Sequence, residues 1–150
     1  MEGTILTQFQ DLGFSAVLAL AAIGSALGTG AAGMAAVGAW KKCFAQSKAA
    51  PFILTVFVGA PLSQTIYGFI VMNTLASKVS GGTYFWFAGI LAGTAIGMSA
   101  LMQGKAGAAA SDALAETGKG FGNYIMVLGV IETVALFVMV FILQAVGNIK

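Results

Sequence analysis

The chain contains no histidine and no arginine, and its 150 residues include a single cysteine and two prolines. The missing imidazoles exclude a histidine-based metal site. The missing arginines argue against nucleic-acid recognition, in which arginine makes the commonest specific contact. The lone Cys43 cannot form an internal disulfide. Charged residues make up 8% of the chain, far below the roughly 25% of soluble domains, so the chain has no room for a soluble catalytic domain.

Long apolar stretches dominate the sequence instead. Hydrophobic residues make up 59% of it, and the mean hydropathy is +0.94. A transmembrane helix needs about 20 apolar residues, and four stretches qualify, roughly 12–39, 51–76, 84–110 and 122–146. Short polar connections join them, as in antiparallel helical hairpins. We predict an all-α membrane protein of four transmembrane helices, built as two tandem hairpins over residues 1–79 and 80–150.

The distribution of lysine predicts how the helices are oriented. The first and third connecting regions hold Lys41, Lys42, Lys48, Lys105 and Lys119, whereas the opposite side holds only Lys78 and Lys150. Positive residues favour the cytoplasmic side of a membrane. We therefore expect loops 40–48 and 111–120 in the cytoplasm, and both termini on the outer side of the cell membrane.

The two hairpins resemble each other in sequence. The first span reads AAIGSALGTGAAGMAA and the third TAIGMSALMQGKAGAAA, so that Ser25 aligns with Ser99 and Gly30 with Gly104. The second and fourth spans match more weakly and place Gln64 opposite Glu132. The chain therefore reads as a duplicated hairpin in which one copy has kept an acid and the other carries its amide analogue.

Small residues recur every four positions in the first and third spans, as in Gly24 and Gly28 or Gly93 and Gly97. This spacing lets helix backbones approach closely in lipid. Two arrangements follow from it and stay open. One is a homo-oligomeric ring with the thin helices inside, and the other is a self-contained four-helix bundle.

The segment GTGAAG, residues 28–33, matches the dinucleotide fingerprint by spacing alone. That motif needs a preceding strand and a helix that begins at its glycines. Here the glycines fall inside a predicted apolar helix, so we expect no nucleotide cofactor.

Glu132 is the only charge in the apolar run from residue 124 to 146. An ionisable side chain at the centre of a bilayer costs roughly 2.5–3.5 kcal/mol on insertion scales. Such residues usually serve a function, and we regard Glu132 as the ion-translocating carboxylate rather than as a catalytic residue.

Polar residues gather on one face of the second span. Ala60, Ser63, Gln64 and Tyr67 follow the spacing i, i+3, i+4 and i+7, which places them on one side of a helix. Pro61 has no N–H to donate, so a backbone carbonyl near it is freed to act as a ligand.

Two further polar residues complete the candidate site, Gln103 in the third span and Thr133 beside Glu132. Together these residues offer oxygen ligands, which hard cations prefer. One negative charge suits a monovalent ion, with Na⁺ as the first candidate and H⁺ as the alternative. Counted from the outer ends of their spans, Gln103 and Glu132 differ in depth by about 6 Å, so it stays open whether Gln103 reaches the ion.

These residues resemble those of the proteolipid rotor-ring subunit of V-type ATPases (the K or c subunit), in particular the Na⁺-translocating bacterial kind. The similarity covers all four spans through GSALGTG, PLSQTIYGF, MQGKAGAAA and VIETVALF. It implies that several copies form a ring, which cytoplasmic ATP hydrolysis on other subunits turns against a stator. The chain would then not be an enzyme by itself.

The same resemblance implies the roles of the site residues. Each copy would carry one Na⁺ on Glu132, held also by Gln64, Gln103, the Ser63 hydroxyl and the backbone carbonyl of Ala60. Tyr67 would hydrogen-bond the glutamate and hold the site closed. Relatives often have Thr in place of Ser63 and Tyr in place of Val134.

The implied partners are copies of the chain itself, a stator membrane subunit, membrane lipid, and central-stalk subunits at loops 40–48 and 111–120, with no nucleic acid. Two alternative functions are weighed. One is the same rotor role with H⁺ as the ion. The other is a small four-helix antiporter with a single membrane glutamate, although such proteins are shorter and place the acid in the first span.

Overall fold

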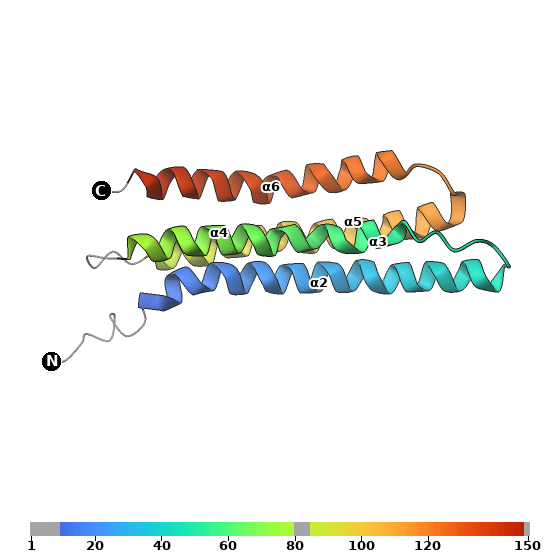
Figure 1. The fold of residues 1–150 in the computed structure, drawn as a ribbon, viewed down its shortest axis with the longest axis horizontal. Coiled ribbons are helices and arrows are strands. Elements are labelled where there is room, and N and C mark those ends of the chain that lie inside the picture. Colours follow the sequence, from blue (N-terminus) through green and yellow to red (C-terminus); the bar gives the residue numbers. More distant parts are fainter. Residues whose placement is uncertain (1–9, 80–84, 149–150) are drawn as a thin grey trace.

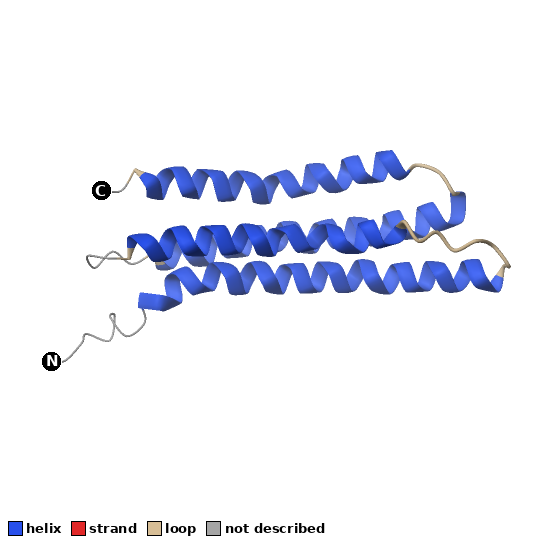
Figure 2. Ribbon diagram, in the orientation of Figure 1, coloured by secondary structure: helices blue, strands red, loops and turns tan. Residues whose placement is uncertain are grey.

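The computed structural model describes residues 10–79 and 85–148 as a bundle of long helices (Figure 1). The helices are α2 (Gln10–Ala45), α3 (Leu54–Gly59), the short 3-10 helix η1 (Ala60–Leu62), α4 (Ser63–Lys78), α5 (Trp86–Thr117) and α6 (Phe121–Gly147). Figure 2 shows these helices joined by loops, with no strand among the described residues. Four segments are long and apolar enough to cross a membrane, if α3, η1 and α4 are taken as one continuous span from Leu54 to Lys78. The predicted all-α fold with four spans is confirmed.

The helices extend beyond the apolar stretches that predict them. The helix α2 continues to Ala45 through part of the segment expected as a loop, and α5 continues to Thr117 through most of residues 111–120. Lysine, alanine, leucine and glutamate are good helix formers outside the bilayer as well as inside it. Lys105, which we counted with the third loop, lies within α5.

Glycines in left-handed conformations end α5 and precede α6. Gly118 has φ 67° and donates its N–H to the carbonyl of Leu114, and Gly120 has φ 90°. Glycine adopts this region without steric penalty, which explains its place at helix ends. The connections after α2 and after α5 lie at one end of the bundle, and the start of α2 and the end of α6 lie at the other (Figure 1).

Some sequence predictions fall outside the described residues. The boundary between the two hairpins falls at Val79, beside residues 80–84, which are not described. Residue 84, the predicted start of the third span, and Lys150, counted on the outer side, are likewise not described.

The glycines of α2 and α5 bring these two helices into close backbone contact. A Cβ atom added at Gly24 would meet the backbone of Gly97, and one at Gly104 would meet the backbone of Gly28. One added at Gly93 would lie 2.7 Å from the Cα atom of Val17. Only a residue without a side chain fits at these positions, as the small-residue spacing predicts. The close contacts join two helices of the same copy.

The bulkier helices α4 and α6 pack on this inner pair, α4 against both α2 and α5, and α6 against α5 and α4. Two apolar clusters result. One is centred on residues such as Val71, Ile96 and Ala135, and the other on Phe57 and Leu128. Along α6, Glu132 falls between Leu128 and Ala135. The polar residues of the candidate site therefore interrupt an otherwise apolar core.

The outward face of α6 is apolar and exposed. Its residues include Met126, Val130, Val134, Phe137 and Phe141, each between 53% and 67% exposed. An exposed apolar face of this size suits lipid or another copy of the chain rather than water.

Candidate functional site

The site begins where Pro61 interrupts the second membrane span. The chain changes there from α-helix to the 3-10 turn Ala60–Leu62 and returns to α-helix at Ser63. Proline cannot donate to the carbonyl one turn earlier, and its ring crowds that turn. The backbone carbonyl of Ala60 lies 3.1 Å from the Ser63 hydroxyl oxygen. The 3-10 turn at Pro61 thus places a backbone oxygen beside the polar face of α4, where the sequence predicts one.

The carboxylate of Glu132 lies against this polar face. Its Oε1 atom accepts hydrogen bonds from Ser63 Oγ at 2.5 Å and from Tyr67 Oη at 2.6 Å. Its Oε2 atom accepts one from Gln103 Nε2 at 3.1 Å. The half-buried acid of α6 is therefore held by donors from both α4 and α5.

Two buried glutamines connect the three helices of the site. Gln64 is 0% and Gln103 1% exposed. Gln64 Nε2 donates to Gln103 Oε1 at 2.7 Å, and Gln103 Nε2 reaches both Glu132 and the backbone carbonyl of Leu128 at 3.1 Å. Buried amides need such partners, because an unpaired polar group costs about 1–3 kcal/mol.

The depth offset expected between Gln103 and Glu132 is smaller in the structure and does not keep the two side chains apart. Helix α5 begins at Trp86 rather than at residue 84, which removes about 3 Å of the offset at the helical rise per residue. The length of the two side chains spans the rest. Gln103 presents its nitrogen to Glu132, however, and its oxygen to Gln64, whereas the sequence interpretation treated it as an oxygen ligand.

The hydroxyl of Ser63 lies within hydrogen-bond distance of more acceptor oxygens than its single hydrogen can bond. Its Oγ atom is 2.5 Å from Glu132 Oε1, 3.1 Å from Gln64 Oε1 and 3.1 Å from the carbonyl oxygen of Ala60. A hydroxyl has one hydrogen to donate. Four oxygen atoms therefore meet at one point with too few hydrogens between them, and one of the four carries a negative charge. Such a set of oxygens is suited to a hard cation.

The predicted residues Ala60, Ser63, Gln64, Gln103, Glu132 and Tyr67 are all brought together. Thr133 does not join them, because its Oγ1 donates to the carbonyl of Val130 in its own helix at 2.7 Å. A hydroxyl next to an acid in sequence points to another side of the helix, since neighbours in an α-helix are about 100° apart.

Sequence reasoning did not assign a role to Ser99. Its Oγ donates to the backbone carbonyl of Ile131, the residue before Glu132, at 2.8 Å. The signal was present, because Ser99 and Gln103 are four residues apart and share one face of α5.

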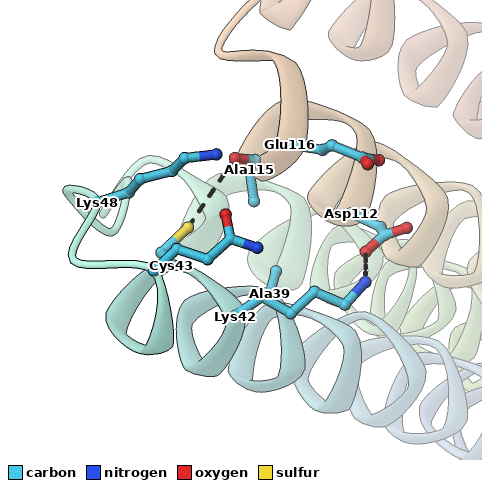
Figure 3. Close-up of a pocket in the computed structure, with 8 residues that line it drawn as sticks. Ala39, Lys42, Cys43, Lys48, Asp112, Ala115 and Glu116 are labelled. Carbon is cyan, nitrogen blue, oxygen red and sulfur yellow. Dashed lines mark hydrogen bonds and ion pairs between the residues drawn. The ribbon is translucent and has the colours of Figure 1, made fainter.

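A hollow lies at the loop end of the bundle, between the ends of α2 and α5 (Figure 3). It has a volume of about 200 Å³, and its lining residues include Lys42, Cys43, Lys48, Asp112 and Glu116. Lys42 Nζ pairs with Asp112 Oδ1 at 2.7 Å, and the two side chains are 67% and 55% exposed. Exposed pairs of this kind contribute about 0–1 kcal/mol. The hollow belongs to the helix ends and contains none of the residues around Glu132.

Comparison with known proteins bears on the second hairpin. Residues 86–144 match the sequence model of the ATP synthase C-subunit family. The match spans all of α5 and nearly all of α6, and so includes Ser99, Gln103 and Glu132. A comparison with curated protein sequences gives no match. The second hairpin is thus similar in sequence to this family, whose members are non-catalytic membrane subunits of ATP synthase complexes that assemble into oligomeric rings.

Proposed function

We propose that the chain is the rotor-ring subunit of a V-type, Na⁺-translocating rotary ATPase, and that each copy carries one Na⁺ at Glu132. One observation carries the choice of ion. Ser63 Oγ meets three acceptor oxygens, from Ala60, Gln64 and Glu132, with a single hydrogen to share among them. A cation between these oxygens relieves their mutual repulsion and neutralises the carboxylate at once.

The ligand set follows from the same contacts. Glu132 supplies the charge, and the hydroxyl of Ser63, the amide oxygen of Gln64 and the carbonyl of Ala60 supply neutral oxygens. Gln103 hydrogen-bonds Glu132 through its nitrogen. A half-turn of its amide would bring its oxygen to the ion instead. A single carboxylate favours a monovalent ion, because a divalent one would leave an uncompensated charge in a dry site.

The V-type assignment rests on the duplication. The matched segment 86–144 is one hairpin, and the chain contains two. Gln64 of the first hairpin stands where the second has Glu132. Each set of four helices therefore has a carboxylate at only one of these two matching positions, which lowers the number of ions moved per turn of the ring. Fewer ions per turn leave more of the free energy of ATP hydrolysis for each ion, as a pump requires.

The transport cycle follows from the need to neutralise Glu132. A bare carboxylate facing lipid is strongly unfavourable, so the ring can turn past lipid only with each site loaded. Tyr67 and Ser63 hold the loaded carboxylate against α4. At a stator subunit, a cationic side chain and an aqueous path would release the ion. Moving one charge against 100 mV requires about 2.3 kcal/mol, which ATP hydrolysis on other subunits supplies.

The orientation forms part of the proposal. The end of α2 and the loops that follow α2 and α5 contain Lys41, Lys42, Lys48 and Lys119. These loops lie at one end of the bundle (Figure 1). The positive-inside rule places that side in the cytoplasm. The loops there, 46–53 and 118–120, then face the central stalk, and both chain ends lie outside.

A proton-carrying rotor is the second candidate. A protonated Glu132 has a hydrogen of its own, which relieves part of the same shortage of donors around Ser63. The antiporter alternative has less support, because the acid lies in the fourth span and the matched family consists of rotary ATPase subunits.

Carbodiimide labelling of the purified protein in lipid vesicles tests the proposal. The reagent attacks accessible protonated carboxyl groups. At fixed pH and ionic strength, with K⁺ replacing Na⁺ in the control, Na⁺ should protect Glu132 from labelling. Glu132→Gln should abolish the labelling, and Glu116→Gln, at the exposed loop end, should not. Labelling that depends on pH but is indifferent to Na⁺ would favour the proton carrier.

A further inference from the structure

Helix α5 makes two hydrogen bonds to backbone carbonyls of α6 in the turn that leads into Glu132. Ser99 Oγ donates to the carbonyl of Ile131 at 2.8 Å, and Gln103 Nε2 donates to the carbonyl of Leu128 at 3.1 Å. In an α-helix the Leu128 carbonyl is also the acceptor for the N–H of Glu132. Both α5 donors therefore act on the turn of α6 that carries the acid.

The antiparallel arrangement makes this pair of contacts sensitive to register. Ser99 and Gln103 are one turn apart on α5, and the carbonyls they bond are three residues apart on α6 in the reverse order. A slide of one helix along the other would break both bonds together. The two hydrogen bonds thus fix the position of Glu132 along the axis of α6, and its direction around that axis, relative to the oxygens of α4.

The first hairpin offers an internal comparison. Ser25 occupies the place of Ser99 in the duplication, and it is also buried, at 2% exposed. Its hydroxyl has no hydrogen-bond partner among the described residues. The same residue type thus bonds the neighbouring helix only in the hairpin that carries the acid. General helix packing does not explain this difference, because both serines are buried.

We propose that Ser99 is a positioning residue for the ion site, which holds the Glu132 turn of α6 in the register that lets its carboxylate meet Ser63 and Tyr67. Ser99 does not touch the ion. It acts through the Ile131 carbonyl. The role rests on the proposed function, in that the site it positions is the ion-carrying one.

The test compares variants of the full-length protein in lipid vesicles, through the Na⁺ concentration that half-protects Glu132 from carbodiimide. Ser99→Ala should raise this concentration by about three- to tenfold, the effect of one lost hydrogen bond. Ser99→Thr, which keeps the hydroxyl, should restore it. Ser99→Cys, close to serine in size but a weak donor, gives a second variant should alanine disturb folding. Ser111→Ala is the matched control, since Ser111 is 0% exposed but bonds Gly107 within its own helix at 2.9 Å.

The outcomes separate this role from the proposed function. If Na⁺ protects every variant equally, the Na⁺ site stands and the positioning role of Ser99 is wrong. The same holds if Ser99→Ala lowers thermal stability but leaves protection unchanged. If Na⁺ does not protect even the wild type, the Na⁺ assignment fails, and the pH of half-maximal labelling becomes the readout. A shift of that pH in Ser99→Ala and not in Ser111→Ala supports the role, and its absence overturns it.

Discussion

Gln103 and Glu132 meet across the interface of α5 and α6, with Gln103 Nε2 3.1 Å from Glu132 Oε2. The same amide accepts a hydrogen bond from Gln64 on α4. The polar groups of three helices thus form one connected network inside an apolar bundle. A network of this kind is stable only while every member keeps its partners. Removing one member should therefore weaken both the bundle and the ion site.

Replacing Gln103 by alanine removes the centre of that network. Gln64 Nε2 and Glu132 Oε2 each lose a partner, and each buried group left unpaired costs about 1–3 kcal/mol. We expect a lower thermal unfolding temperature and at least a tenfold higher half-protecting Na⁺ concentration. Gln144→Ala, on the exposed side of α6 near its end, is the control. Wild-type Na⁺ protection in Gln103→Ala would remove Gln103 from the site.

Tyr67→Phe tests whether the phenol holds the carboxylate closed. The change keeps the ring and removes the 2.6 Å hydrogen bond to Glu132 Oε1. We expect carbodiimide to label Glu132 about tenfold faster or more without Na⁺, because one bond of about 1.5–3 kcal/mol to a charged group is lost. Tyr124→Phe, whose ring packs edge-on against Phe57, should label at the wild-type rate. Equal rates in the two variants would argue against a closing role.

Ser63→Ala removes the hydroxyl that lies among the three acceptor oxygens of Ala60, Gln64 and Glu132. The carboxylate loses its 2.5 Å donor, and the cation loses a ligand. We expect weaker Na⁺ protection, by about tenfold or more for a charge-assisted contact, with little change in unfolding temperature. Ser77→Ala is the control, since Ser77 is exposed and bonds Thr74 within its own helix. Unchanged protection in Ser63→Ala would contradict the oxygen cluster as the ion site.

Gly24→Ala tests the close packing of α2 on α5. Its added Cβ would overlap the backbone of Gly97, which cannot move as a side chain could. Overpacking of this kind costs about 1–3 kcal/mol or more, so we expect a lower unfolding temperature in detergent. Gly38→Ala is the control in the same helix, because nothing lies near its added Cβ. That change should be neutral or stabilising by up to about 1 kcal/mol, since alanine favours helix.

The sequence predicted the four spans, the backbone carbonyl ligand near Pro61 and the polar face of α4, because each rests on a local periodicity or on one residue's covalent geometry. The first and third spans were predicted to end earlier than the helices α2 and α5 do. Hydropathy marks where the chain is apolar, whereas α2 and α5 continue into polar sequence that still favours helix.

The finer arrangement of the site depends on how helices far apart in sequence are aligned. Counting residues from the span ends left it open whether Gln103 reaches Glu132, because the predicted third span began at residue 84 whereas α5 begins at Trp86. The contact of Ser99 with the Ile131 carbonyl needs the register of two helices, and no pattern within one helix contains that register.

Direct binding of radioactive Na⁺ to the purified protein, measured by equilibrium dialysis, tests the central claim. The account predicts saturable binding of one Na⁺ per chain, which Glu132→Gln abolishes and Glu116→Gln leaves intact. Absence of saturable Na⁺ binding in the wild type, or binding that survives Glu132→Gln, would contradict it.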